Sequence, residues 1–156
     1  MPPAAPPSAP PLAVLFACGQ NSLRSPMAAG LFGKIFGRAV YVGSAGVRKG
    51  ELDPFAVAAM AEIGIDISRH KPVTFEELAE WEGLNFDLII TLSPEAHHRA
   101  LELSRSSAVE VEYWPTSDPT IVEGNREQRL SAYRQLRDQL LARIQERFAR
   151  SVPVND

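Results

Sequence analysis

Short apolar runs alternate along the chain with segments of helical spacing. Residues 12–17 (LAVLFA) and 86–92 (FDLIITL) are almost continuously apolar, which is typical of strands buried on both faces. Shorter runs at residues 39–43 and 109–114 predict two further strands. Helical spacing of apolar residues predicts helices over residues 25–37, 53–64, 75–81, from 93 onward, and 125–149. This alternation indicates an α/β fold, a single three-layer domain whose four-stranded parallel sheet has helices on both faces.

Capping residues mark several of these helix boundaries. Asp53-Pro54 and Ser93-Pro94 each combine an N-cap residue with a proline in the first turn, and Thr74-Phe-Glu-Glu77 has the form of a capping box. Gly37 and Gly64 are suitable helix terminators. The last helix is predicted to bury a stripe formed by Leu130, Tyr133, Leu136, Leu140, Ile144 and Phe148.

The two ends of the chain differ from the rest in composition. Residues 1–11 (MPPAAPPSAPP) contain six prolines and no charged side chain, which predicts a disordered tail rather than a targeting signal. A proline-rich ligand for a partner is the alternative interpretation. We expect one domain over residues 12–150, with residues 151–156 as a short second tail.

Composition and charge exclude several classes of function. Hydrophobic residues make up 45% and charged residues 22% of the 156, as in an ordinary globular protein, and no apolar run approaches the ~18 residues of a membrane-spanning helix. A net charge of −3 gives no reason to expect a nucleic-acid partner. With Cys18 as its one cysteine, the chain can form no internal disulfide, which favours a cytoplasmic location.

The segment after the first strand carries the candidate chemistry. It reads Cys18-Gly-Gln-Asn-Ser-Leu-Arg24-Ser25-Pro26, between a buried strand and a helix. Ligands of parallel sheets bind beyond the carboxyl ends of the strands, and backbone N–H groups at a helix start favour anions. Arg24 can bind two oxygens of a phosphate-like dianion, and the same positive environment favours the reactive thiolate of Cys18. The Ser25 hydroxyl can either hydrogen-bond this thiolate or cap the helix.

A lone cysteine is more often an inert small hydrophobe than a nucleophile. Here Cys18 leaves a strand, Arg24 follows six positions later and a helix begins at once. This combination predicts a phosphate-binding loop with Cys18 as its nucleophile.

The run LAVLFACGQNSLRSPMA resembles the start of the low-molecular-weight protein tyrosine phosphatases, whose loop is C-x-G-N-x-C-R-S after a first strand. Ser44-Ala45-Gly46 resembles the family's turn after strand two, and Gly64-Ile65-Asp66 the turn after the next helix. Trp114–Pro119 resembles the loop with the family's Asp-Pro general acid. The resemblance extends over residues 12–150 and implies a four-stranded parallel sheet flanked by helices. Thioredoxin-coupled arsenate reductases share this scaffold.

The resemblance implies roles for individual residues. Cys18 is the expected nucleophile, Arg24 the phosphate clamp, Ser25 the partner of the thiolate and Asp118 the general acid and later base. Asn21 occupies the asparagine position that holds the family's loop in a strained conformation. The residues expected to bind substrate are Gly19, Gln20, Asn21, Ser22, Leu23 and Ser25. The implied reaction passes through a phosphocysteine, releases inorganic phosphate and needs neither metal nor cofactor.

Three positions depart from the family pattern. Gln20 replaces a loop glycine, and its side chain either distorts the loop or points outward. Leu23 replaces a second cysteine, so no neighbouring thiol can protect Cys18 as a disulfide. Thr120 replaces an aromatic residue of the tyrosine-specific enzymes, which weakens the case for phosphotyrosine.

We therefore expect a cytoplasmic phosphomonoester hydrolase, of the protein-tyrosine-phosphatase type, that acts on a phosphorylated protein or a small aryl phosphate. One alternative is arsenate reduction with an external thiol, because the thioredoxin-coupled reaction needs two further cysteines and the chain has none. The other is a non-catalytic module that binds oxyanions or phosphoproteins. Gln20 and Leu23 motivate that alternative, whereas the combination of Cys18, Arg24 and Asp118 argues against it.

Other polar residues are expected to be structural. His97 and His98 are adjacent on a predicted helix, so they face different directions, and His70 is isolated in the sequence. Asp53 is interpreted as a helix cap. The seven arginines between Arg126 and Arg150 are interspersed with acidic residues, which favours a solvated, ion-paired helix face over a basic docking surface.

Overall fold

Four parallel strands form one sheet in the order β2-β1-β3-β4. The computed structural model describes residues 13–83, 85–105 and 107–148. Its strands are β1 (Ala13–Cys18), β2 (Tyr41–Gly46), β3 (Leu88–Thr91) and β4 (Glu110–Tyr113). Its α-helices are α1 (Arg24–Phe36), α2 (Pro54–Ala61), α3 (Phe75–Glu82), α4 (Pro94–Ser104) and α5 (Arg126–Phe148). Two short 3-10 helices, η1 (Gly37–Ala39) and η2 (Pro119–Ile121), complete the described structure.

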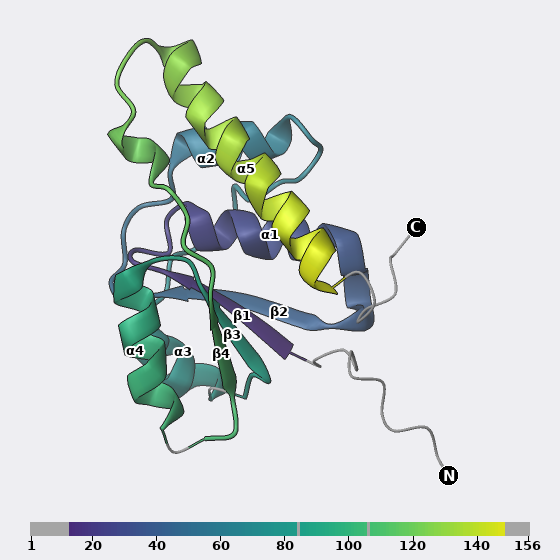
Figure 1. The fold of residues 1–156 in the computed structure, drawn as a ribbon, viewed down its shortest axis with the longest axis vertical. Coiled ribbons are helices and arrows are strands. Elements are labelled where there is room, and N and C mark those ends of the chain that lie inside the picture. Colours follow the sequence, from purple (N-terminus) through teal and green to yellow (C-terminus); the bar gives the residue numbers. More distant parts are fainter. Residues whose placement is uncertain (1–12, 84, 106, 149–156) are drawn as a thin grey trace.

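The helices cover both faces of the sheet, which confirms the predicted three-layer α/β fold. Helices α1, α2 and α5 lie on one face, and α3 and α4 lie on the other (Figure 1). Side chains of β1 alternate between the two cores, because successive residues of a strand point to opposite faces. Val14, Phe16 and Cys18 belong to the first core, and Ala13, Leu15 and Ala17 to the second.

The strand order places the end of β1 at a reversal of the sheet. Strand β1 lies between β2 and β3, and the chain leaves it to build the sheet in both directions. Such reversals open a crevice at the carboxyl ends of the strands, where ligands of α/β proteins bind. Cys18, the last residue of β1, therefore lies at the crevice.

The second strand lies further along the chain than predicted. The apolar pattern predicts residues 39–43, but η1 occupies Gly37–Ala39 and the strand covers Tyr41–Gly46. The interpretation of Ser44-Ala45-Gly46 as a turn is therefore wrong. These residues stay in the strand because their pairing with β1 continues up to Cys18, which lies opposite Gly46.

The predicted helix caps are present. Asp53 Oδ1 accepts a hydrogen bond from Phe55 N (2.8 Å), Ser93 Oγ accepts one from Ala96 N (3.2 Å), and Thr74 and Glu77 form a capping box. Helix α2 ends at Ala61 and is therefore shorter than the predicted helix over residues 53–64. The short helix η2 is not predicted from the sequence. The predicted tails, residues 1–11 and 151–156, lie outside the described residues.

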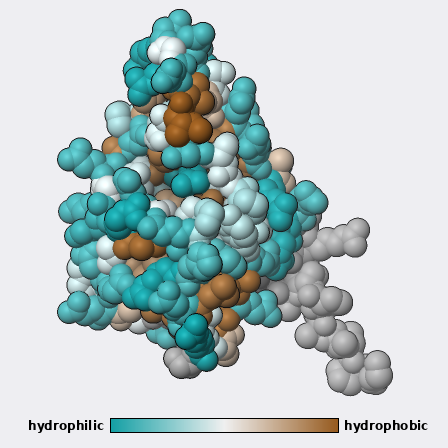
Figure 2. Space-filling model, turned by 60° about the vertical axis from the view of Figure 1, so that its left-hand side comes forward, coloured by the Kyte–Doolittle hydropathy of each residue, from teal (hydrophilic) through white to brown (hydrophobic). Residues whose placement is uncertain are grey.

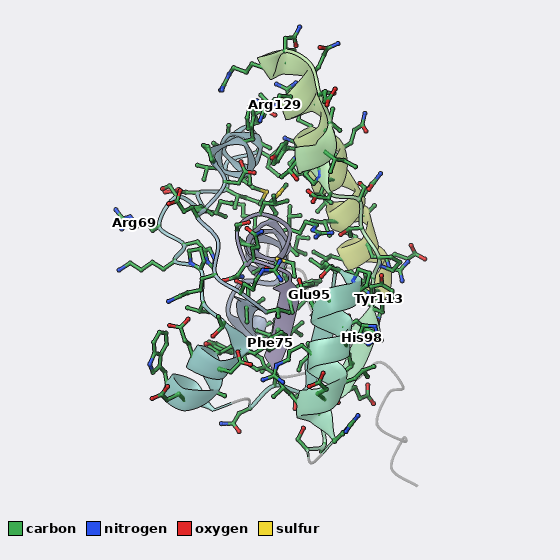
Figure 3. The ribbon with its side chains drawn as sticks, turned by 90° about the vertical axis from the view of Figure 1, so that its left-hand side faces the viewer. Arg69, Phe75, Glu95, His98, Tyr113 and Arg129 are labelled. Atoms are coloured by element: carbon green, nitrogen blue, oxygen red, sulfur yellow. The ribbon has the colours of Figure 1, made fainter. Side chains whose placement is uncertain are left out.

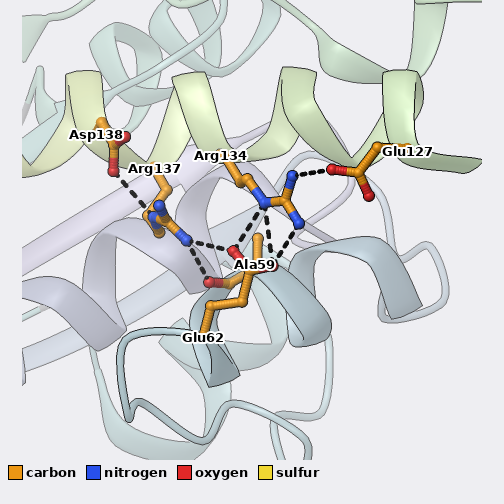
Figure 4. A network of polar contacts seen from close by, with 6 residues as sticks. All are labelled: Ala59, Glu62, Glu127, Arg134, Arg137 and Asp138. Carbon is orange, nitrogen blue, oxygen red and sulfur yellow. Dashed lines mark hydrogen bonds and ion pairs between the residues drawn. The ribbon is translucent and has the colours of Figure 1, made fainter.

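Helix α5 buries its whole predicted stripe and one additional charged residue, Arg137. Arg137 Nη1 donates to Ala59 O and to Glu62 Oε1, at the end of α2 (2.8 and 2.9 Å). Arg134 binds the same carboxylate and also Glu127 (Figure 4). The hydrogen bond from Arg134, reinforced by Arg137, lowers the pKa of Glu62 to about 2. The two arginines thus fasten α5 to α2.

The described surface gives no indication of a membrane segment. None of the helices in the described residues has both the length and the apolar character needed to cross a bilayer. On the face shown in Figure 2, apolar residues form small, separate patches within a mainly hydrophilic surface.

We expect the Glu62 ion pairs to give a pH-dependent stability. Because the folded pKa is about 2 and the ordinary value 4.5, their contribution is complete above pH 4.5 and is lost as the pH falls toward 2. Glu62→Gln should lower the midpoint of urea unfolding modestly at pH 7, since the site is exposed. The difference from the wild type should shrink as the pH falls. The control is Glu80→Gln, on the exposed side of α3. A difference that remains constant from neutral to strongly acidic pH would contradict this account.

Candidate active site

Cys18 lies buried at the end of β1 with its sulfur beside a hydroxyl group. Its Sγ is 2.9 Å from Ser25 Oγ, in the first turn of α1. Asn21 Nδ2 donates to the same Ser25 oxygen at 2.8 Å. Because this oxygen accepts from Asn21, its own hydrogen is left to point at the sulfur. Ser25 therefore hydrogen-bonds Cys18 and does not cap the helix, and its hydroxyl can stabilise a thiolate.

Asn21 is the only described residue other than glycine with a positive φ, at +56°. This left-handed conformation is unfavourable for a residue with a side chain, so contacts must hold it in place. Asn21 Oδ1 accepts hydrogen bonds from Val73 N (2.9 Å) and His70 Nε2 (3.0 Å), while Nδ2 binds Ser25. These contacts fix the turn of the Cys18 loop, which we define as residues 18–25.

His70 supports the loop, a link that the sequence analysis did not find. Its Nε2 lies within 3.2 Å of both Asn21 O and Asn21 Oδ1. Both are acceptors, so Nε2 carries the hydrogen. Burial lowers the pKa of His70 and so favours the neutral ring, while the hydrogen bond to the Asn21 backbone has the opposite, smaller effect. Its role is structural, as expected, but it acts at the site.

Four carbonyl groups of the Cys18 loop bind a segment that follows β2. The acceptors are the carbonyls of Cys18, Gly19, Gln20 and Ser22, and the donors are Val47 N, Arg48 N, Gly50 N and Asp53 N. We call residues 47–53 the outer segment. All described peptide bonds are trans, and in a trans peptide the N–H points away from the carbonyl. Each bond therefore turns the following loop N–H away from the outer segment. Three of the four residues that carry these N–H groups, Gly19, Gln20 and Leu23, line one pocket.

Arg24 is oriented by neutral acceptors. Its Nη1 donates to Thr116 O (3.2 Å) and Leu92 O (3.4 Å), and Thr116 Oγ1 also donates to Leu92 O (2.8 Å). These carbonyls lie just beyond β3 and β4. They fix the guanidinium, and none of the described carboxylates forms an ion pair with it, so its positive charge remains available for an anion.

The same pocket contains Asp118 beside the Cys18 loop. The pocket has a volume of about 200 Å³. Its lining comprises Cys18, Gly19, Gln20, Ser22, Leu23, Arg24, Arg48, Ser93, Pro94, Glu95, Asp118 and Thr120. Asp118 Oδ1 accepts hydrogen bonds from Thr120 N (3.0 Å) and Thr120 Oγ1 (2.6 Å). Thr120, one of the departures from the family pattern, therefore orients the carboxylate.

The other predicted binding residues are distributed around the loop. Gly19, Ser22 and Leu23 line the pocket and are buried, whereas Gln20 lines it with an exposed side chain. The Gln20 side chain lies beside Gly50, and the loop keeps its bonds to the outer segment. The buried Asn21 and Ser25 act from behind the lining, because they hold the turn and the sulfur.

An ion pair lies at the mouth of the pocket. Arg48, from the outer segment, binds Glu95 in the first turn of α4, and each side chain is about half exposed. Figure 3 shows Glu95 at the end of α4 that faces the centre of the molecule. The pocket lining contains no aromatic side chain in the described part of the chain. The lining of this pocket is therefore polar and charged, and none of its described residues offers a ring to stack on a phenyl group.

The histidines of α4 take no part in this site. His97 Nδ1 lies 2.9 Å from Thr91 Oγ1, and His98 is exposed. Within residues 13–83, 85–105 and 107–148, no group of three or more His, Cys, Asp or Glu side chains is arranged to hold a metal ion.

Comparison with known proteins identifies relatives over nearly the whole chain. Residues 13–150 match the family described as low molecular weight phosphotyrosine protein phosphatase. A protein from Bacillus licheniformis named arsenate reductase is 36% identical over 137 residues, which cover 87% of this chain and 94% of that protein. The solved low molecular weight protein tyrosine phosphatase from T. tengcongensis has a TM-score of 0.70 at 25% identity, covering 88% and 97% of the two chains. An arsenate reductase solved in its phosphate-binding state has a TM-score of 0.64 at 29% identity, covering 88% and 96%.

The close approach of Gly46 to the loop generates a prediction. A Cβ at Gly46 would lie 2.7 Å from Asn21 N and from Arg48 O, distances that force backbone to move. We expect Gly46→Ala to fold but to bind inorganic phosphate at least about tenfold more weakly, because the loop N–H groups are displaced. Isothermal titration calorimetry measures this affinity. Gly33→Ala is the control, since its Cβ would meet only Val42 Cγ1 at 3.8 Å. Unchanged phosphate affinity in Gly46→Ala would show that the loop tolerates the shift.

Proposed function

Because the chain belongs to the low molecular weight phosphotyrosine protein phosphatase family, we propose that it is a cysteine-dependent phosphatase that works through a phosphocysteine on Cys18. The observation that carries this proposal is the composition of the pocket. Its nucleophile, Cys18, is the only cysteine of the chain, and the same pocket contains a carboxylate, Asp118. Water and Asp118 can complete a phosphatase cycle without a second thiol.

In the first step, Cys18 Sγ attacks phosphorus in line with the leaving oxygen. The S–P bond forms, the P–O bond breaks, and Asp118 gives its proton to the departing oxygen. Inward-facing N–H groups of the Cys18 loop and the Arg24 guanidinium hold the three equatorial oxygens. Ser25 donates to the sulfur before attack, which stabilises the thiolate.

In the second step, water hydrolyses the phosphocysteine. Asp118, now ionised, takes a proton from a water molecule. The oxygen of this water attacks phosphorus, and the S–P bond breaks. Inorganic phosphate leaves and Cys18 returns to the thiolate. Thr120 holds only Oδ1 of Asp118, and Oδ2 has no hydrogen-bond partner among the residues the structure describes. One carboxylate oxygen thus remains to transfer the proton in both steps.

The proposed substrate is a phosphorylated protein or a small phosphate ester. The charged mouth formed by Arg48 and Glu95 supports a polar leaving group, and Thr120 gives no aromatic wall for a tyrosine ring. Specificity for phosphotyrosine therefore has less support than the reaction itself. An aryl phosphate remains a suitable probe, because its leaving group departs easily.

Arsenate reduction is the second candidate, and the named relatives favour it more directly than phosphatase activity. The relative from Bacillus licheniformis is named arsenate reductase, and it matches this chain over 94% of its own length. Arsenate is small enough for a pocket without aromatic walls, and Cys18 can attack arsenic as it attacks phosphorus. Reduction to arsenite takes two electrons, however, and the chain has no second cysteine. An external thiol would have to supply them.

The deciding experiment compares wild type and Cys18→Ser with two substrates. We expect the wild type to hydrolyse p-nitrophenyl phosphate, and Cys18→Ser to bind phosphate but turn over nothing, because a hydroxyl ionises far less readily than a thiol. Arsenate with excess glutathione tests the second candidate through release of arsenite. Arsenite release without phosphate ester hydrolysis would replace the proposal by arsenate reduction. Phosphate binding with neither activity would identify a non-catalytic binding module.

Arg24→Lys tests the bidentate contact. Lysine keeps the positive charge but has no planar pair of donors, so we expect kcat/KM for p-nitrophenyl phosphate to fall by about two orders of magnitude. The same change at the exposed Arg69, outside the pocket, is the control. Near wild-type turnover by Arg24→Lys would show that the guanidinium does not hold the transferred group.

A further inference from the structure

Asp53, the last residue of the outer segment, joins three parts of the molecule. Its backbone N–H donates to Ser22 O in the Cys18 loop (2.9 Å). Oδ1 accepts from Phe55 N and caps α2 (2.8 Å), and Oδ2 accepts from the hydroxyl of Tyr133 on α5 (2.6 Å). The sequence predicts only the cap for Asp53. The bond from Tyr133 connects the longest helix to the loop through one residue.

Tyr133 is well placed to hold Asp53. The ring is buried and stacks on Phe55, with centroids 5.3 Å apart and an interplanar angle of 24°. Burial, followed by the hydrogen bond to Asp53, raises the pKa of Tyr133, so the hydroxyl stays protonated and donates. Asp53, Tyr133, Ser22, Leu23 and other residues line a groove that adjoins the catalytic pocket. The contact therefore lies directly behind the loop.

We infer that Tyr133 is a positioning residue of the anion site. Its hydroxyl fixes Asp53, Asp53 N–H holds the Ser22 carbonyl against the outer segment, and the trans peptide then directs Leu23 N–H into the pocket. Loss of the hydroxyl frees Asp53 to move and loosens one of the donors for the oxyanion. The inference rests on the proposed function only in taking this pocket as the anion site.

A second set of contacts between α2 and α5 separates positioning from simple packing. Arg134 joins α5 to Glu62 at the other end of α2 (Figure 4). Its hydrogen bonds within the described part of the chain go to Glu62 and Glu127, not to the Cys18 loop or the outer segment. Removing Arg134 weakens the docking of the same two helices. If Tyr133 has a purely structural role, loss of its hydroxyl and loss of Arg134 should affect anion binding alike. If it is a positioning residue, only the loss of the Tyr133 hydroxyl should weaken anion binding.

The experiment measures the affinity for inorganic phosphate by calorimetry, together with urea unfolding, in Tyr133→Phe and Arg134→Gln. Tyr133→Phe keeps the ring and its stacking on Phe55, and should bind phosphate about tenfold more weakly. Arg134→Gln should be destabilised yet bind phosphate within about twofold of the wild type. Equal losses in the two variants, or wild-type affinity in Tyr133→Phe, would overturn the inference.

A pair of changes at Asp53 provides an independent test. Asp53→Asn keeps an oxygen for Phe55 N and an amide group that can bond the Tyr133 oxygen, so it should retain most of the affinity that Asp53→Ala loses. Equal phosphate affinity in these two variants would also contradict a positioning role. Because phosphate binding needs no turnover, a protein that binds phosphate normally but hydrolyses nothing would overturn the proposed function and leave this inference standing.

Discussion

The outward anchoring of the loop carbonyls is the interaction on which the rest of the site depends. A dianion is bound strongly only where donors already point at it, and backbone N–H groups point inward only when their carbonyls are held outward. Here the four anchoring bonds come from the outer segment, which the parallel pairing of β2 with β1 brings alongside the loop. Gly46 allows the backbone of β2 to approach that of the Cys18 loop. Asn21 adopts the left-handed conformation that the turn of the loop requires.

Neutral groups orient the three side chains of the pocket that carry the proposed reaction. The Ser25 hydroxyl faces the sulfur of Cys18, backbone carbonyls hold Arg24, and Thr120 holds one oxygen of Asp118. A carboxylate beside Arg24 would neutralise the positive charge that the proposed reaction uses. Ion pairs are instead found at the mouth, between Arg48 and Glu95, and between α2 and α5, where they join elements without touching the sulfur.

The sequence was sufficient for the fold class and for the local part of the site. Periodicity identifies β1 and α1, and Cys18, Arg24 and Ser25 lie close together in sequence on either side of one turn. The sequence could not reveal hydrogen-bond partners that lie far away along the chain. His70 is 49 residues from Asn21, and Tyr133 is 80 residues from Asp53. Thr116 is 92 residues from Arg24. Such contacts depend on how the layers pack. The end of β2 differs from the prediction for the same reason, because the pairing with β1 sets it and not the apolar pattern of β2 itself.

The most direct measurement is the detection of the covalent intermediate itself. In Asp118→Ala, p-nitrophenolate can still leave without a proton, whereas attacking water has lost its base, so the intermediate should accumulate. Acid quenching followed by mass spectrometry of the peptide that contains Cys18 should show a phosphoryl group on this residue within the first turnovers. Continued release of p-nitrophenolate from a protein whose Cys18 remains unmodified at every quench time would contradict the phosphocysteine mechanism.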